Sequence, residues 1–455
     1  MNIINLSSSL ILTMLRRKEK EDSPGHSYSH ILRGISTALA GKGIALATSF
    51  VAVPLTVRYL GAERYGVWVT LTSVLGWLTI FDLGIGNTAI NSVAEALAHE
   101  DFQTARLRIN TAYLTLAAVA AVLGLGLAAA WHWISWPLVL GAQVGTNSDE
   151  ITQSAAILCF VVLANFPLAV TSRILGACKK VTLANYWSSA ASLLSLLLLV
   201  IATRLHAGLA GLVLAFSGST LLVGTLSAAW LYHHFEWLKP TFRGIRRKNI
   251  SELLSGGVPF FAVQISGLIL FQTDNIIIAQ ILGAGAVTPY SVTWKLFSYA
   301  SLISTISIPS LWPAYADAFA RRDFGWIRKT YWYNIRVVVG LTLVVVAILM
   351  FIGRRFIALW AGSAAEPSIG LVVAMAAWTV LVAPLWCQSC LLGAAGRVKG
   401  QAIYSATGAV VNVGVSIWAG RVFGLTGVIM GTLCAYAVCI LIPQTLDVQR
   451  LLSNK

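Results

Sequence analysis

Apolar residues fill long runs of this chain, and polar residues gather in the short segments between them. Twelve runs come close to or exceed the ~20 residues that a helix needs to cross a hydrocarbon core of about 30 Å. They predict transmembrane helices over 31–57, 66–92, 107–131, 151–172, 181–203, 209–232, 253–282, 287–313, 331–352, 367–391, 400–420 and 425–447. The pattern therefore predicts an all-α protein that crosses a membrane many times.

One short sequence pattern occurs twice along the chain, at a spacing of 222 residues. Leu60-Gly61-Ala62 returns as Leu282-Gly283-Ala284, and Asp101-Phe102 returns as Asp323-Phe324. Shorter matches continue through the second part of each half. Six helices per repeat is an even number, so both halves enter the membrane in the same direction. A cavity can then open between two related lobes.

The repeat divides the chain into four parts. We expect a cytoplasmic extension over 1–30, an N-terminal six-helix lobe over 31–235, a basic cytoplasmic linker over 236–250 and a C-terminal six-helix lobe over 251–455. In the extension the basic residues follow the apolar ones, which is the reverse of a signal peptide. Asp101 and Asp323 should each begin a helix, where an acid suits the N-terminus. Glu95 and Asp317 should pair with nearby basic residues.

Composition and charge support a membrane protein and fix its predicted orientation. Hydrophobic residues make up 57% of the chain and charged residues 11%, against about 25% charged in a soluble domain. Of the Lys and Arg residues assigned to the loops and the chain ends, 22 lie on the side that carries both termini. Six lie on the other side: Arg58, Arg64, Arg204, Arg354, Arg355 and Arg421. The positive-inside rule therefore places both termini in the cytoplasm.

The net charge of +15 does not indicate nucleic-acid binding, because the basic residues lie in loops between apolar spans. The six cysteines are scattered in or beside these spans. Cys387 and Cys390 have metal-like spacing but lack a second pair, so we interpret them as small buried apolar residues. The sequence predicts no metal site and no cofactor.

The segment Arg58-Tyr59-Leu60-Gly61-Ala62-Glu63-Arg64-Tyr65-Gly66, followed by Trp68 and by Asp82-Leu83-Gly84-Ile85-Gly86-Asn87, resembles the polysaccharide-transporter branch of the multidrug/oligosaccharidyl-lipid/polysaccharide exporter superfamily. The resemblance is to O-antigen or exopolysaccharide repeat-unit flippases and covers roughly 31–450. It implies a V-shaped pair of lobes and alternating access. It also implies a substrate, an undecaprenyl-pyrophosphate-linked oligosaccharide moved from the inner to the outer leaflet of the cell inner membrane. A polysaccharide polymerase and chain-length proteins are the expected partners.

Charged and polar residues inside the predicted spans are the candidate site, because a charge there is costly and needs a reason. Lys42 and Lys295, with Arg336, are expected to receive the pyrophosphate. The residues expected to contact sugars are Gln264, Gln272, Asn275, Trp294 and Asn87. Alternatively, Lys42 pairs with Asp82 and Lys295 pairs with Asp274, while Arg336 extends to the membrane interface.

Asp82 and Asp274 are the candidates for coupling transport to protons or to a cation, because burial raises the pKa of a carboxyl group. For Asp82 there is a structural alternative, in which Asp82-Leu83-Gly84 bends a helix.

Two other functions compete with the flippase. A membrane-bound polymerase or ligase would need a constellation of nucleophile and base, and none appears in the short outer loops. A cation-coupled exporter of small molecules from the same superfamily is the closer alternative. Its cavity should be acidic or apolar for cationic substrates, which Lys42 and Lys295 disfavour.

Overall fold

The computed structural model is helical over most of its length. It describes residues 24–453 apart from Leu83, 143–146, Lys179, 236–237, 239–246 and Ser307. The side chains of 24–35, Leu39, Asn87, 247–248, most of 252–271 and 303–310 also lie outside the described part. The extension and linker predicted over 1–30 and 236–250 therefore fall largely outside it.

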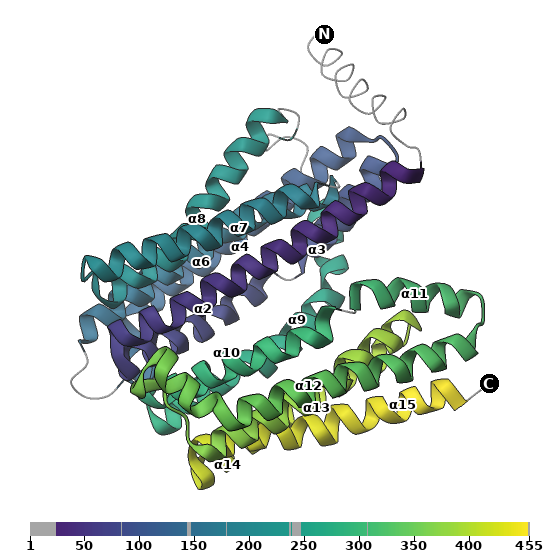
Figure 1. The fold of residues 1–455 in the computed structure, drawn as a ribbon. Helices are drawn as coiled ribbons and strands as arrows, with labels where there is room; N and C mark the ends of the chain where they lie inside the picture. Colours follow the sequence, from purple (N-terminus) through teal and green to yellow (C-terminus); the bar gives the residue numbers. More distant parts are fainter. Residues whose placement is uncertain are drawn as a thin grey trace.

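The helices are named here in chain order, with the labels used in Figure 1. They are α2 (Pro24–Gly76), η1 (Trp77–Asp82), α3 (Ile85–Ala98), α4 (Phe102–Ala130), η2 (Trp131–Trp133), α5 (Trp136–Val139), α6 (Ser148–Ala177), α7 (Val181–Arg204), α8 (Gly208–His234), α9 (Arg247–Leu282), α10 (Ala284–Ile306), α11 (Ile308–Ala320), α12 (Phe324–Ala361), η4 (Ser363–Ala365), α13 (Ile369–Ala394), α14 (Val398–Tyr436), the π-helical turn η5 (Ala437–Leu441) and α15 (Ile442–Ser453).

Eight helical segments of the described chain are long and apolar enough to cross a membrane. Two of them, Ser36–Asp82 and Val398–Ser453, each contain a backbone break, at Gly61 and Gly424. Each of these two segments therefore holds two arms. With α9 and the α10–α11 pair added, the arrangement is compatible with the twelve predicted spans. The prediction of an all-α, multi-pass membrane protein is confirmed.

The internal repeat is visible in the backbone itself. Gly61 and Gly283 both have positive φ, 74° and 87°, and their neighbours Leu60 and Ala284 belong to one buried cluster. Asp101 and Asp323 each accept a hydrogen bond from a main-chain amide three residues later, at 2.9 and 3.0 Å. Both therefore cap a helix as predicted. A further hydrogen bond, from the Thr104 side chain, holds the pKa of Asp101 below its usual value.

The predicted pairing of the two other repeated acids is also confirmed. Glu95 lies 3.2 Å from Arg108, and Asp317 pairs with Arg321 one turn further along its helix.

The second predicted span, 66–92, is not one straight helix. α2 ends at Gly76, a 3₁₀ turn follows, and α3 starts after Gly84, whose φ is 70°. Asp82 accepts a hydrogen bond from the amide of Gly86 at 3.1 Å and so holds the first turn of α3. The alternative in which Asp82-Leu83-Gly84 bends this helix is thus confirmed.

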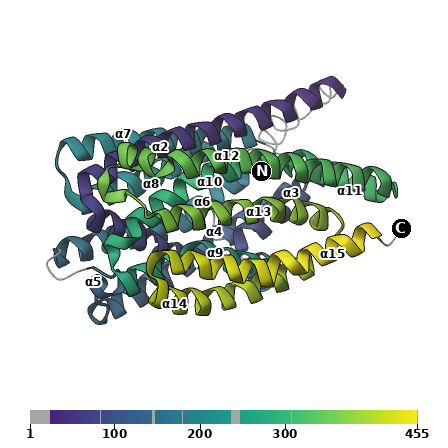
Figure 2. The same ribbon diagram turned by 60° about the horizontal axis from the view of Figure 1, so that its bottom comes forward.

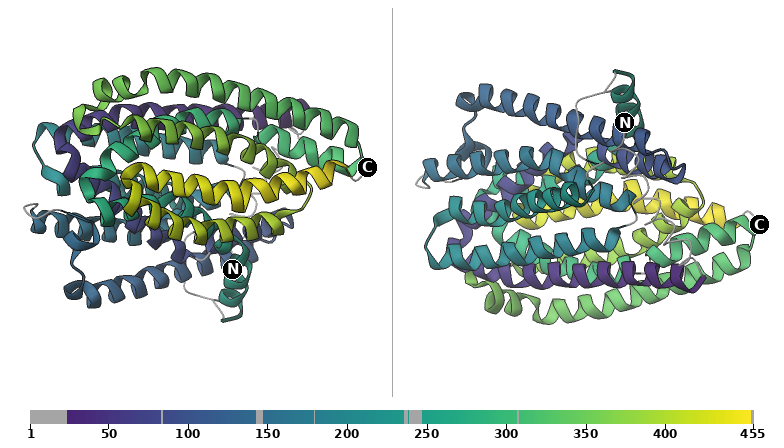
Figure 3. Two further views of the ribbon diagram at one scale, coloured as in Figure 1. Left: turned by 90° about the horizontal axis from the view of Figure 1, so that it is seen from below. Right: turned by 90° about the horizontal axis from the view of Figure 1, so that it is seen from above.

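The helices form two lobes. Figure 1 shows that α2 to α8 and α9 to α15 make separate bundles. The bundles meet at one end and diverge toward the end where α2 begins and α15 finishes. Figure 2 shows the long helices of both bundles running in roughly the same direction. In both views of Figure 3, α2 and α12 lie along one edge, where the lobes touch.

The closed end is packed through apolar residues of both lobes. A single buried cluster joins Val57, Leu60 and Leu71 of α2 to Leu296 of α10 and Ile357 of α12. At its tightest point α2 and α10 approach so closely that a Cβ added at Gly66 would lie 1.7 Å from the carbonyl oxygen of Ala284. At position 66 there is therefore room only for the hydrogen atom of a glycine side chain.

Two cross-lobe hydrogen-bond contacts reinforce this end. Pro54 has no N–H, so the carbonyl of Phe50 lacks its usual helical partner. The indole Nε1 of Trp360 donates to this carbonyl at 3.0 Å, and the rings of Trp360 and Phe50 stack at 4.7 Å. Arg58 donates to the last carbonyls of α12, at Leu359 and at Trp360. The two helices therefore satisfy each other's free backbone groups.

Candidate functional site

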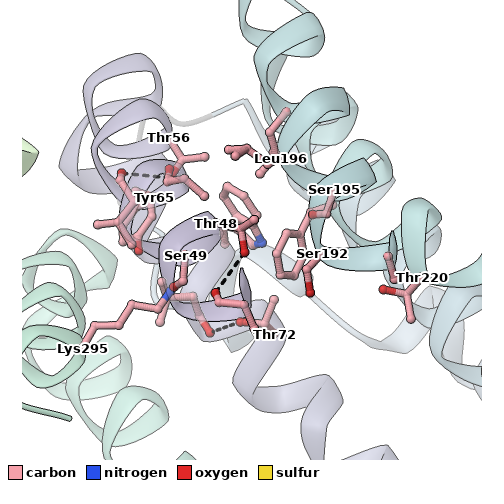
Figure 4. A pocket seen from close by; sticks show the side chains of 18 of the residues that line it. Thr48, Ser49, Thr56, Tyr65, Thr72, Ser192, Ser195, Leu196, Thr220 and Lys295 are labelled. Atoms are coloured by element: carbon pink, nitrogen blue, oxygen red, sulfur yellow. Dashed lines mark hydrogen bonds between the residues drawn. The ribbon is translucent and has the colours of Figure 1, made fainter. Parts of the chain in front are cut away.

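A cavity of about 550 Å³ lies in the N-terminal lobe, between both arms of α2, α7 and α8, and Lys295 of α10 reaches its wall from the C-terminal lobe. That volume is within the range of small-molecule sites, about 300–1,000 Å³. Its polar lining consists mainly of small hydroxyl side chains, some of which Figure 4 shows: Thr48, Ser49, Thr56, Thr72, Ser188, Ser192, Ser195 and Thr220. Aromatic rings of Tyr65, Trp68 and Phe216 complete it.

The hydroxyl groups present acceptors to this cavity. Thr48, Thr56 and Thr72 each donate to a carbonyl three or four residues earlier, at 2.9, 2.8 and 2.8 Å. A hydroxyl that donates to its own helix keeps its oxygen lone pairs for another partner. The lining can therefore accept hydrogen bonds from a ligand rich in hydroxyl groups.

Lys295 supplies the positive charge of the described lining. It lies on α10, about 16 Å along the helix from Ala284 at 1.5 Å per residue, and extends toward Ser49 in Figure 4. Among the described residues, no carboxylate lies within salt-bridge distance of its ammonium. The structure thus brings an unpaired cation to the wall of a hydroxyl-lined cavity.

Lys42 lies on the same face of α2 as the cavity, but outside the lining. It precedes Ser49 by seven residues, which is two turns or about 10 Å toward the open end, and its side chain is exposed. A ligand entering from the open end would meet Lys42 before Lys295.

The other candidates for substrate contact are spread over the C-terminal lobe and the seam between the lobes. Asn275 donates to Ser73 of α2 at 3.0 Å, and Gln272 lies 3.8 Å from the position of a Cβ at Gly76. Trp294 packs 6.4 Å from Trp378, and Arg336 is exposed on α12. The side chains of Gln264 and Asn87 lie outside the described residues.

The partners of the two candidate aspartates differ from those considered from the sequence. Asp82 forms a salt bridge of 2.9 Å with Arg173 of α6, not with Lys42. Both members are only partly exposed, at 16% and 24% of their side-chain surface. Arg173 follows directly after the predicted span 151–172, and its position beside Asp82 depends on how α3 and α6 pack.

Asp274 is 6% exposed and does not pair with Lys295. One oxygen, Oδ2, accepts from Tyr290 at 2.7 Å and from Thr432 at 3.0 Å. The Asn412 side chain also interacts with this carboxylate, although neither Oδ1 of Asp274 nor Nδ2 of Asn412 makes a hydrogen bond of standard geometry within the described part of the chain. A buried carboxylate surrounded by neutral polar groups can take up a proton or a small cation.

The small hydroxyl residues of the cavity were not predicted. They repeat at helical spacing, as Thr48, Ser49 and Thr56 on α2 and as Ser188, Ser192 and Ser195 on α7. This spacing is the signal that the sequence contains, although it is equally typical of close helix packing in membranes.

Residues 31–319 match the model of a family described as "Polysaccharide biosynthesis protein". The chain belongs to this family. One relative, named as an O-antigen transporter of Salmonella typhi, is 24% identical over 312 residues, 67% of this chain and 69% of that protein. Another, named as an O-antigen export protein of Yersinia pseudotuberculosis, is 22% identical over 424 residues, 90% of this chain and 94% of that protein.

Solved structures show that the fold of this family member is shared with transporters. An inward-facing MATE family transporter of the MOP superfamily superposes with a TM-score of 0.75 at 18% identity, covering 92% of this chain and 99% of the other. An outward-facing structure gives 0.65. The lipid II flippase MurJ, in an inward closed conformation, gives 0.70 at 14% identity, covering 90% and 87%. These likenesses establish the two-lobed fold.

Proposed function

We propose that this protein is a flippase, which moves an undecaprenyl-pyrophosphate-linked oligosaccharide from the inner to the outer leaflet of the cytoplasmic membrane. The observation that carries the proposal is the 550 Å³ cavity with an unpaired lysine on a wall of hydroxyl groups. Diphosphate and sugar are the two chemistries that this wall matches. The names of the O-antigen relatives and the family match support it.

In this proposal the two lysines handle the diphosphate in sequence. Lys42, exposed about one turn of α2 before the first lining residue Ala45, attracts the headgroup as it enters from the open end. Lys295 then pairs with the diphosphate inside, where fewer water molecules compete. The hydroxyl lining accepts hydrogen bonds from the sugar, and Tyr65, Trp68 and Phe216 offer apolar faces to it. The polyprenyl chain stays in the bilayer.

The open end is proposed to face the cytoplasm. The basic residues around Arg321, Arg322 and Arg397 lie at this end, together with the start of α2 and the end of α15. The positive-inside rule places such residues inside the cell. With this orientation the lobes would diverge toward the inner leaflet, where the lipid-linked substrate would be loaded. A polymerase and chain-length proteins would act on the product in the outer leaflet.

The proposal is tested by reconstituting the full-length protein into liposomes that contain a fluorescent undecaprenyl-pyrophosphate oligosaccharide. A membrane-impermeant reductant bleaches the label in the outer leaflet only. We expect bleaching of the inner-leaflet fraction to require the protein. If the liposomes transport a fluorescent organic cation but leave the lipid-linked sugar in place, the chain is instead a small-molecule exporter.

Asp274 is proposed as the coupling residue, since Asp82 is held by Arg173 and by the first turn of α3. We expect Asp274→Asn to remove the dependence of flipping on an imposed proton or sodium gradient, because the amide cannot exchange a proton or bind a cation electrostatically. Downhill exchange should continue. The measurement is the flipping rate in liposomes with and without each gradient.

Asp82→Asn is the matched control for this prediction. It also converts a partly buried carboxylate to an amide, but the gradient dependence should remain while thermal stability falls. Gradient dependence that survives in Asp274→Asn and disappears in Asp82→Asn would move the coupling role to the other lobe.

A further inference from the structure

α12 is much longer than a membrane requires. Its 38 residues extend about 57 Å at 1.5 Å per residue. The charge-free segment 337–353 lies between Arg336 and Arg354, which are about 27 Å apart along the helix. That distance is close to the ~30 Å thickness of the hydrocarbon core. Arg336 therefore lies near one membrane interface, and the first twelve residues of α12 project about 18 Å beyond it.

The projecting part of α12 has one buried and one exposed face. Ile327 and Tyr331 pack against α11 and α13 in a buried cluster. The exposed face carries three aromatic residues, Trp326 at 40%, Trp332 at 44% and Tyr333 at 70%. Three exposed cations lie between and beside them: Arg328, Lys329 and Arg336. We call these six residues the α12 face.

The cations of the α12 face are not neutralised by the protein. Among the described residues none of them forms a salt bridge. The nearest acids in sequence are already engaged, because Asp323 caps α12 and Asp317 pairs with Arg321. The face therefore keeps its positive charge.

The duplicated half provides an internal comparison. At a spacing of 222 residues, Trp326, Lys329 and Tyr333 correspond to Thr104, Leu107 and Thr111 of α4. These three α4 residues line a pocket of about 330 Å³ that is closed on one side by Asn249 and Leu253 of α9. In the N-terminal lobe this helix face is thus partly covered, with Thr111 buried and Thr104 and Leu107 half-buried. In the described part of the C-terminal lobe it is exposed, and Trp326, Lys329 and Tyr333 replace these neutral residues, while Arg328 corresponds to Arg106, which is also a cation.

We propose that the α12 face binds the headgroups of anionic phospholipids in the leaflet at the open end. The length of α12 places Trp332, Tyr333 and Arg336 within about 6 Å of the interface, at headgroup depth. Arg328 and Lys329 lie about 11–12 Å beyond it along the helix, where their long side chains can reach back to the headgroups. Its three cations complement phosphate groups, and its Trp and Tyr side chains are the residues enriched at headgroup depth. Binding at this face anchors the C-terminal lobe at a fixed depth in the membrane. The equivalent face of the N-terminal lobe lines a pocket with α9 instead. The α12 face is a proposed lipid site that is separate from the transport cavity.

The test is native mass spectrometry of the full-length protein in detergent, titrated with dioleoyl phosphatidylglycerol and, separately, with dioleoyl phosphatidylcholine. The wild-type protein should retain phosphatidylglycerol preferentially. The triple variant Arg328→Gln, Lys329→Gln and Arg336→Gln should bind it at least about tenfold more weakly, since each basic residue near an anionic surface contributes to affinity. A control triple variant, Arg204→Gln, Arg355→Gln and Arg421→Gln, removes the same charge from exposed positions near the closed end and should bind normally.

A second variant controls for the possibility that the first one misfolds. Trp326→Thr, Lys329→Leu, Trp332→Asn, Tyr333→Thr and Arg336→Leu replace the face with the residues that the equivalent helix α4 already carries. It should keep the melting temperature and lose the lipid preference. Equal retention of both lipids by the wild type, or equal loss in both triple variants, overturns the proposal. If the α12 triple variant changes the oligomeric state and leaves lipid binding intact, the face is an interface with a second copy instead.

Discussion

Lys295→Met is expected to lower the flipping rate by at least about 30-fold while leaving the melting temperature equal or higher. Losing one partner of a buried charged contact costs about 2 kcal/mol or more in binding, which corresponds to that factor. The folded state gains stability, because the substitution removes from the interior a cation that has no acidic partner among the described residues. Opposite changes in activity and stability indicate a residue retained for function.

The measurement is the liposome bleaching rate, paired with thermal unfolding in detergent. Lys295→Arg should keep most of the activity, since it preserves the charge. Arg421→Met is the matched control, because it removes an exposed cation outside the cavity. A Lys295→Met protein that flips at the normal rate, or that is less stable than the wild type, would remove Lys295 from the binding site.

Gly66→Ala is expected to prevent the closed end from closing and to slow flipping by about tenfold or more. The added methyl group would overlap the carbonyl oxygen of Ala284, which belongs to a helix held in place by a 2.9 Å bond from the Ala284 amide to Gly141. Overpacking of this kind costs about 1–3 kcal/mol. The cost falls on the closed conformation only, so the population shifts toward the conformation in which the lobes separate there.

This shift can be measured with spin labels on exposed residues of each lobe at the closed end, Leu138→Cys and Leu359→Cys, in a background without the native cysteines. Gly66→Ala should populate longer distances than the wild type. Gly126→Ala is the control, because nothing lies within 4 Å of a Cβ at that glycine. Wild-type distances and rates in Gly66→Ala would show that this contact does not move during transport.

Local chemistry explains which parts of the fold the sequence predicted. The repeated Asp-Phe pairs predicted two helix starts correctly, because a cap depends on residues within one turn. The repeated Leu-Gly-Ala is also repeated in the backbone, since both of its glycines have positive φ.

The site was harder to predict because it depends on which helix faces meet. Lys295 was predicted as a site residue because a charge inside a membrane is energetically costly, and the structure places it on the cavity wall. Both suggested lysine–aspartate pairs were wrong. Asp82 binds Arg173, and Asp274 binds two hydroxyl groups. Such pairings join residues 91 and 158 positions apart, and no spacing in the sequence specifies them.

The bond from Trp360 to the carbonyl of Phe50 has a consequence for the order of events in transport. Pro54 leaves that carbonyl without a donor from its own helix, so when the lobes part at this end it needs a new one. Water is the donor at hand, and an unsatisfied carbonyl costs about 1–3 kcal/mol until water arrives. The closed end should therefore open only as it becomes hydrated, with solvent entry preceding the separation of the helices.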